Sequence, residues 1–161
     1  MLPPEAIQVI ESSPTRLVIL DPPFYSFGLW LAFLAALAFA LTIVVALKIR
    51  LGFGVVPLVF AIVLAGIGSF LCTAKTVYTL SRSDGALRTE TYAWGIKRGE
   101  SKLPLETIRR VNVETIEYNH ILTVILNTGE SFNLGNGSNR QGYYGAADAM
   151  NNFLGVPVQQ R

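Results

Sequence analysis

Two apolar stretches near the start of the chain decide its fold. Residues 27–47 read FGLWLAFLAALAFALTIVVAL, residues 53–74 read FGVVPLVFAIVLAGIGSFLCTA, and neither contains a charged residue. At about 1.5 Å per helical residue each would extend roughly 30 Å, the thickness of the hydrocarbon core of a bilayer. Only residues 48–52 separate the two stretches. We therefore predict a helical hairpin that crosses a membrane twice.

Two other readings of these stretches fit less well. Two buried helices of a soluble bundle would need more surrounding chain than 161 residues supply to cover surfaces that are apolar on all sides. A cleaved signal peptide would begin with a basic region, whereas the first stretch follows a leader with prolines and acids and precedes a second stretch directly.

The composition divides the chain into a leader (residues 1–26), the hairpin (27–74) and a tail (75–161) long enough for one small domain. The formal net charge is +2, from 13 Lys and Arg against 11 Asp and Glu, a weaker bias than nucleic-acid binders usually show. Cys72 is the single cysteine, so an intrachain disulfide and a zinc site built on several thiolates are excluded.

The distribution of positive charge predicts the orientation of the hairpin. Its loop carries Lys48 and Arg50, whereas the opposite side carries four cationic residues close to the spans. Because cytoplasmic flanks are enriched in Lys and Arg, we expect both termini in the cytoplasm. These four residues are Arg16, Lys75, Arg82 and Arg88.

Beyond Ala74 the sequence predicts six short antiparallel strands followed by one amphipathic helix. A turn is expected at Ser83-Asp84-Gly85, another at residues 95–99, a third at Tyr118-Asn119-His120, and a helical turn at residues 104–107. Residues 135–139 break the strand pattern before the helix, which Gly155 ends. The expected strands are residues 76–81, 87–94, 100–103, 108–116 with a bulge near Arg109-Arg110, 121–126 and 131–134, and the apolar helix face is Tyr143, Ala146, Ala147, Met150, Phe153 and Leu154.

This order of elements resembles the pleckstrin-homology-like (PH-like) domains that bacteria attach to paired membrane spans. The likeness rests on Tyr78-Thr79-Leu80 and on the corner Leu103-Pro104-Leu105-Glu106-Thr107-Ile108 with the strand after it. The resemblance implies a small antiparallel β-barrel or sandwich of seven strands with a C-terminal helix. Because six strands follow the spans, we expect residues 16–20 of the leader to supply the missing edge strand.

The tail is also similar to the two-span photosystem I assembly factor of cyanobacteria and plastids. The stretches that carry this likeness are Arg82-Ser83-Asp84-Gly85, Trp94-Gly95, residues 108–113 and residues 153–158. This chain departs from that family in its shorter hairpin loop and in a leader that has a β-like segment of its own. The two resemblances imply a bacterial inner membrane or a thylakoid membrane and an accessory role in a larger membrane complex, for which the second resemblance makes a photosynthetic complex one candidate.

The residue pattern offers no catalytic site, and we expect no enzyme, cofactor, metal or small-molecule substrate. His120 is the only histidine and lies in a predicted turn, where a solvated side chain is the ordinary outcome. The glycines of residues 135–142 lack the lysine of a phosphate-binding loop.

Binding residues are easier to nominate. We expect contacts with a partner or with lipid from Arg88, Trp94, Lys97, Arg98, Lys102, Arg109 and Arg110, whose cations fall on neighbouring strands and turns. The open alternative is a solvated face on which Glu90, Glu100 and Glu106 pair with these cations. Further aromatic candidates for protein contact are Tyr92, Tyr118, Tyr143 and Tyr144.

The sequence therefore predicts a non-catalytic accessory or assembly subunit of a larger integral-membrane complex. Two alternatives stay open: a module that binds anionic lipid headgroups through a basic face, and a small membrane enzyme that depends on residues of a partner. Nucleic acid is not an expected partner.

Overall fold

A computed structural model describes residues 6–48 and 55–156, which form two compact units. The helical unit contains helix α1 (Tyr25–Lys48), helix α2 (Val55–Thr73) and the turn residues Ala93–Gly95. The sheet unit contains residues 6–22, 75–92 and 96–156. Of the predicted hairpin loop (residues 48–52), residues 49–52 lie outside the described residues.

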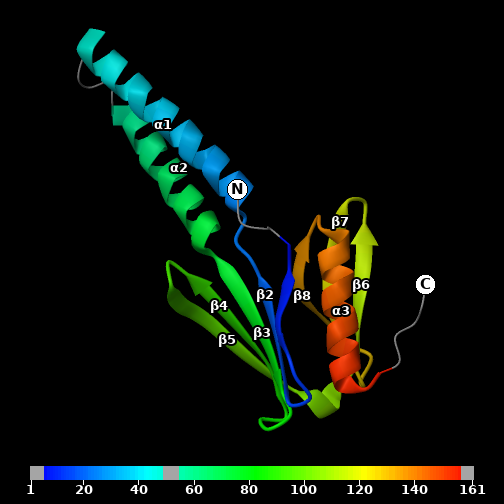
Figure 1. The fold of residues 1–161 in the computed structure, drawn as a ribbon. Helices are drawn as coiled ribbons and strands as arrows, with labels where there is room; N and C mark the ends of the chain where they lie inside the picture. The colour runs from blue at the N-terminus through cyan, green and yellow to red at the C-terminus, as the bar shows by residue number, and fades with distance from the viewer. Residues whose placement is uncertain (1–5, 49–54, 157–161) are drawn as a thin grey trace. The chain divides into compact units, whose positions relative to one another are not determined.

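Helices α1 and α2 lie side by side (Figure 1), and glycines make close contacts between them. A Cβ atom added to Gly68 would lie 2.9 Å from the carbonyl oxygen of Gly28, and one added to Gly28 would lie 2.9 Å from that of Gly68. Such distances leave no room for a side chain at either position. Small residues therefore allow the helix backbones to approach closely.

The other faces of both helices carry large exposed apolar side chains, among them Phe27, Phe39 and Phe60. With 24 and 19 residues, the helices are about 36 Å and about 28 Å long at ~1.5 Å per residue. By length and composition, each could span a membrane.

The sheet unit consists of a five-stranded antiparallel sheet, a three-stranded antiparallel sheet and helix α3 (Arg140–Leu154). The first sheet has the order β1-β2-β3-β4-β5, and the second has the order β6-β7-β8. The strands are β1 (Gln8–Ser12), β2 (Arg16–Asp21), β3 (Lys75–Ser81), β4 (Ala86–Ala93), β5 (Ile96–Pro104), β6 (Ile108–Ile116), β7 (Asn119–Leu126) and β8 (Ser131–Gly137).

The leader contributes two strands to the first sheet. Strand β2 pairs with β3 from Arg16 opposite Ser81 to Asp21 opposite Thr76, which confirms that the leader joins the sheet. It is not the edge strand, however, because β1 pairs with β2 on its other side. The sequence prediction missed β1, a short strand whose residues are mostly exposed.

One hydrophobic core joins both sheets and α3. Leu17 and Ile19 of β2 meet Tyr78 of β3, Leu122 of β7 and Met150 of α3, and each of these side chains is at most 1% exposed. The predicted apolar face of α3 is confirmed, and Gly155 ends the helix in the left-handed region with φ 74°. The predicted helical turn is the 3₁₀ helix η2 (Leu105–Thr107), and the predicted bulge lies between Ile108 and Arg110.

Three predicted boundaries are wrong. Strand β5 starts at Ile96 rather than at residue 100, because Trp94 and Gly95 form a two-residue turn with φ values of 53° and 73°, a geometry that suits the twist of a hairpin. Strand β8 continues to Gly137. His120 lies in β7 and is 7% exposed, because the turn before it is formed by Glu117 and Tyr118.

Candidate functional site

The outer face of the five-stranded sheet gathers most of the ionised side chains of β4 and β5. Side chains alternate along a strand, so the burial of Leu80 and Leu87 in the core places Thr79, Ser81 and Arg88 on the opposite face. The register puts Arg88 beside Thr79, and it puts Arg16 of the leader strand beside Ser81. Residues distant in the sequence thus share one surface.

Four charges on this face form an ion-pair network. Lys97 Nζ donates to Glu90 (2.6 Å) and to Glu100 (2.5 Å), and Arg88 lies 3.4 Å from Glu100. The hydrogen bonds from Lys97 hold the pKa of both carboxyls below the usual range, and those carboxylates raise the pKa of Lys97. Two cations therefore offset two carboxylates, and little net positive charge is left at this point of the face.

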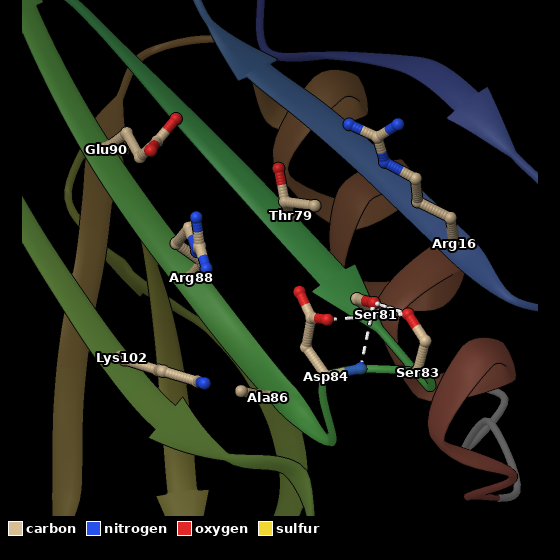
Figure 2. Close-up of a pocket in the computed structure, with 9 residues that line it drawn as sticks. All are labelled: Arg16, Thr79, Ser81, Ser83, Asp84, Ala86, Arg88, Glu90 and Lys102. Atoms are coloured by element: carbon tan, nitrogen blue, oxygen red, sulfur yellow. Dashed lines mark hydrogen bonds between the residues drawn. The ribbon is translucent and has the colours of Figure 1, made fainter.

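A polar cavity of about 290 Å³ lies beside the network. It is lined by Ser81 and Ala86, which have short side chains and face each other across β3 and β4. Figure 2 shows Arg16 and Arg88 on either side of Thr79, and the amine of Lys102 directed toward Ala86. The full lining is Arg16, Thr79, Ser81, Ser83, Asp84, Ala86, Arg88, Glu90 and Lys102.

The turn after β3 holds the acidic wall of the cavity in place. Ser81 Oγ lies 2.8 Å from Ser83 Oγ and accepts a hydrogen bond from the backbone N–H of Asp84 at 3.3 Å. Gly85 follows with φ 61°, a conformation that glycine adopts without strain. The predicted turn at residues 83–85 therefore aims a carboxylate at a cavity that the turn pattern alone did not reveal.

The structure distributes the predicted contact residues over three places. Arg88, Lys97, Arg98 and Lys102 lie on β4 and β5, whereas Arg109 and Arg110 lie on β6 of the other sheet. Trp94 belongs to the helical unit, where its indole N–H donates to Ser69 Oγ (3.0 Å) and its ring meets the Phe70 ring edge to face. The six cations thus do not share one sheet.

The predicted aromatic contacts also separate. Tyr118 is 89% exposed at the β6–β7 turn, while Tyr143 is a core residue at 3%. Tyr92 donates a hydrogen bond to Glu90 (2.9 Å) and so belongs to the ion-pair network. Tyr144 packs against His120, whose Nδ1 lies 2.9 Å from the hydroxyl of Thr115.

A second polar cluster is buried inside the sheet unit. Burial raises the pKa of Asp21 to about 6, and the hydroxyl of Tyr143 lies 3.5 Å from its carboxylate. Tyr78 donates to the carbonyl of Leu134 (2.5 Å), and burial raises the pKa of both tyrosines. A Cβ atom at Gly135 would lie 2.8 Å from the Tyr78 hydroxyl and 2.9 Å from Asp21 Oδ2. A side chain at position 135 would clash with this cluster, so β8 requires glycine there.

Within residues 6–48 and 55–156, no group of three or more His, Cys, Asp or Glu side chains is placed to hold a metal ion. In comparisons with known proteins, no family model and no curated protein matches the chain.

Proposed function

We propose that the protein is a membrane-anchored, non-catalytic accessory or assembly subunit of a larger integral-membrane complex. The observation that carries this proposal is the surface of the helical unit. Its helices pack against each other at Gly28 and Gly68 and leave large apolar side chains facing outward. In a bilayer those faces are available to lipid or to the spans of a partner.

The proposal extends to the type of domain and to the location. The six-strand meander after α2 and the C-terminal helix support a PH-like identity for the sheet unit, which departs from the seven-strand pattern because the leader adds both β1 and β2. A bacterial inner membrane or a thylakoid membrane, with both termini in the cytoplasm, is the location we propose. A photosynthetic complex is one candidate partner.

A pull-down of the tagged full chain in a gentle detergent, followed by mass spectrometry, tests this role. We expect a stoichiometric large membrane complex to remain bound. Gly66 offers a sharp variant, because a Cβ atom there meets nothing within 4 Å, so Gly66→Leu should alter the outer surface of α2 without separating the helices. A protein that emerges alone, or with lipid only, would contradict the accessory role.

A second function, recognition of anionic headgroups, is favoured by the cations Arg16, Arg88 and Lys102 around the cavity. The ion-pair network weakens it, because Lys97 and Arg88 already face carboxylates. Joint neutralisation of Lys97, Arg98, Arg109 and Arg110 separates the two functions. Lost binding to anionic liposomes would support headgroup recognition, whereas an intact complex in the same variant would support the accessory role.

A further inference from the structure

The cavity on the outer face of the five-stranded sheet contains charges of both signs. Three of its five ionised side chains have a partner outside the lining: Arg88 faces Glu100, Glu90 faces Lys97, and Arg16 lies 3.8 Å from Glu11. Among the described residues, Lys102 and Asp84 form no ion pair. The cavity therefore presents one uncompensated cation and one uncompensated carboxylate.

The two uncompensated charges come from different strands and line one hollow. Lys102 is on β5 and Asp84 is in the turn between β3 and β4. Figure 2 shows the Asp84 carboxylate beside Ser81 and Ser83. The register keeps the hollow open, since Ser81 and Ala86 occupy the row where larger residues would fill it.

From this arrangement we infer that the cavity binds a small zwitterion that carries a phosphate and a primary amine, of the phosphoethanolamine class. Lys102, aided by Arg88 and Arg16, would hold the phosphate, and Asp84 would hold the ammonium group. The hydroxyls of Thr79 and Ser83 line the same space and can donate to phosphate oxygens. This inference does not depend on the proposed accessory role.

Size and charge favour a zwitterion over a simple anion. The volume of about 290 Å³ is many times the roughly 10–15 Å³ that one water molecule needs, which leaves room for a headgroup of this class. A phosphate dianion alone would lie near the carboxylates of Asp84 and Glu90, and like charges at short range oppose binding. An attached ammonium turns the Asp84 carboxylate from a repulsive neighbour into a partner.

Isothermal titration of the full chain in a non-ionic detergent at low salt tests the inference, with phosphoethanolamine, inorganic phosphate and ethanolamine as the three probes. We expect phosphoethanolamine to bind at least tenfold more tightly than either fragment. Equal affinity for inorganic phosphate would replace the zwitterion site with a plain anion site and overturn the inference. Absence of heat with phosphoethanolamine would overturn it as well.

Substitutions at Lys102 and Asp84 test whether these two side chains bind the ligand. Lys102→Gln and Asp84→Asn should each weaken phosphoethanolamine binding about five- to tenfold, and Lys102→Arg should restore most of it. Arg140→Gln and Asp148→Asn are matched controls, since both remove an exposed charge from α3 and should leave the affinity unchanged. Melting curves confirm that each variant is folded. The Lys102→Gln substitution removes no ion pair within the described chain. Unchanged binding in this variant would refute the role of Lys102 in binding the phosphate.

The same chemistry could come from a lipid headgroup or from a free compound, and acetylation of Lys102 in nanodiscs distinguishes the two. Protection in phosphatidylethanolamine discs but not in phosphatidylglycerol discs would identify the lipid. Protection that appears only after free phosphoethanolamine is added would identify a soluble ligand. Equal reactivity of Lys102 under all conditions would overturn the site.

Discussion

Asn151 is a buried amide that joins α3 to the edge of the three-stranded sheet. Its Oδ1 accepts from the backbone N–H of Val111 and its Nδ2 donates to the carbonyl of Val111, both at 2.8 Å. Strand β6 is an edge strand, so the backbone groups of Val111 that point away from β7 would otherwise lack partners. The side chain imitates a neighbouring strand at this position.

Replacement of Asn151 by alanine removes both hydrogen bonds and leaves a buried N–H and a buried C=O unpaired. Each net hydrogen bond contributes about 1 kcal/mol, and an unsatisfied buried group costs about 1–3 kcal/mol. We therefore expect Asn151→Ala to lower the free energy of unfolding of the sheet unit by roughly 2–4 kcal/mol. Asn152→Ala is the matched control, because Asn152 is the same residue type and is exposed, and it should change that free energy by less than about 0.5 kcal/mol.

Hydrogen exchange of the full chain in detergent, read by mass spectrometry, is the suitable assay. Both tryptophans, Trp30 and Trp94, lie in the helical unit, so their fluorescence would not report on β6. Since about 1.4 kcal/mol corresponds to a factor of ten, protection of the Val111 amide should fall about 30- to 700-fold in Asn151→Ala. Equal protection in Asn151→Ala and Asn152→Ala would refute the reasoning.

Three further predictions concern the helices, the leader and the pH dependence. Gly68→Leu should force α1 and α2 apart and increase the alkylation of Cys72, which lies against Gly28. Gly66→Leu should not, and equal rates of Cys72 alkylation in the two variants would contradict the packing. The double variant Leu17→Ala/Ile19→Ala should destabilise the sheet unit by about 2–5 kcal/mol per residue in chemical unfolding, whereas Val9→Ala/Ile10→Ala, at exposed positions, should be nearly neutral. Because the Asp21 pKa is raised to about 6 in the folded chain from 3.8, its stabilising contribution is present below pH 4 and is lost as the pH rises through 6. Asp21→Asn should therefore be more stable than the parent at pH 7, by about 1–2 kcal/mol after allowance for partial exposure, and the difference should vanish near pH 4 in melting curves, with Asp148→Asn as the control.

Local patterns predict the elements of this chain well where one face is buried. The alternation in β3 and β4 and the three- and four-residue steps of α3 follow from burial of Tyr78, Leu80 and Met150, and the glycine that ends α3 is a local signal. Boundaries are less predictable because tertiary contacts set them. Strand β8 extends through Gly135, where Asp21 and Tyr78 approach its backbone. No residue near Gly135 in the sequence predicts these contacts.

The candidate site depends on strand register, so the sequence predicts only part of it. The sequence predicts Arg88 and Lys102 as cations of neighbouring strands, but Arg16 reaches the cavity only because β2 pairs with β3. For Asp84 the sequence predicts a turn and no binding role. The role of Asn151 cannot be predicted from the sequence, because a polar residue beside Met150 on a helix is informative only once β6 is known to be an edge strand.

The pairing of β2 with β3 also bears on how the chain can cross a membrane. Asp21, at the end of β2, lies opposite Thr76 of β3. Four residues further on α1 begins, and α2 ends three residues before Thr76. One cross-strand pair thus ties together the segment that enters the helices and the segment that leaves them. If both helices span a bilayer, the sheet therefore requires that the leader and the tail lie on the same side, independently of any count of charges. The cationic flanks Arg16, Lys75, Arg82 and Arg88 then determine which side that is.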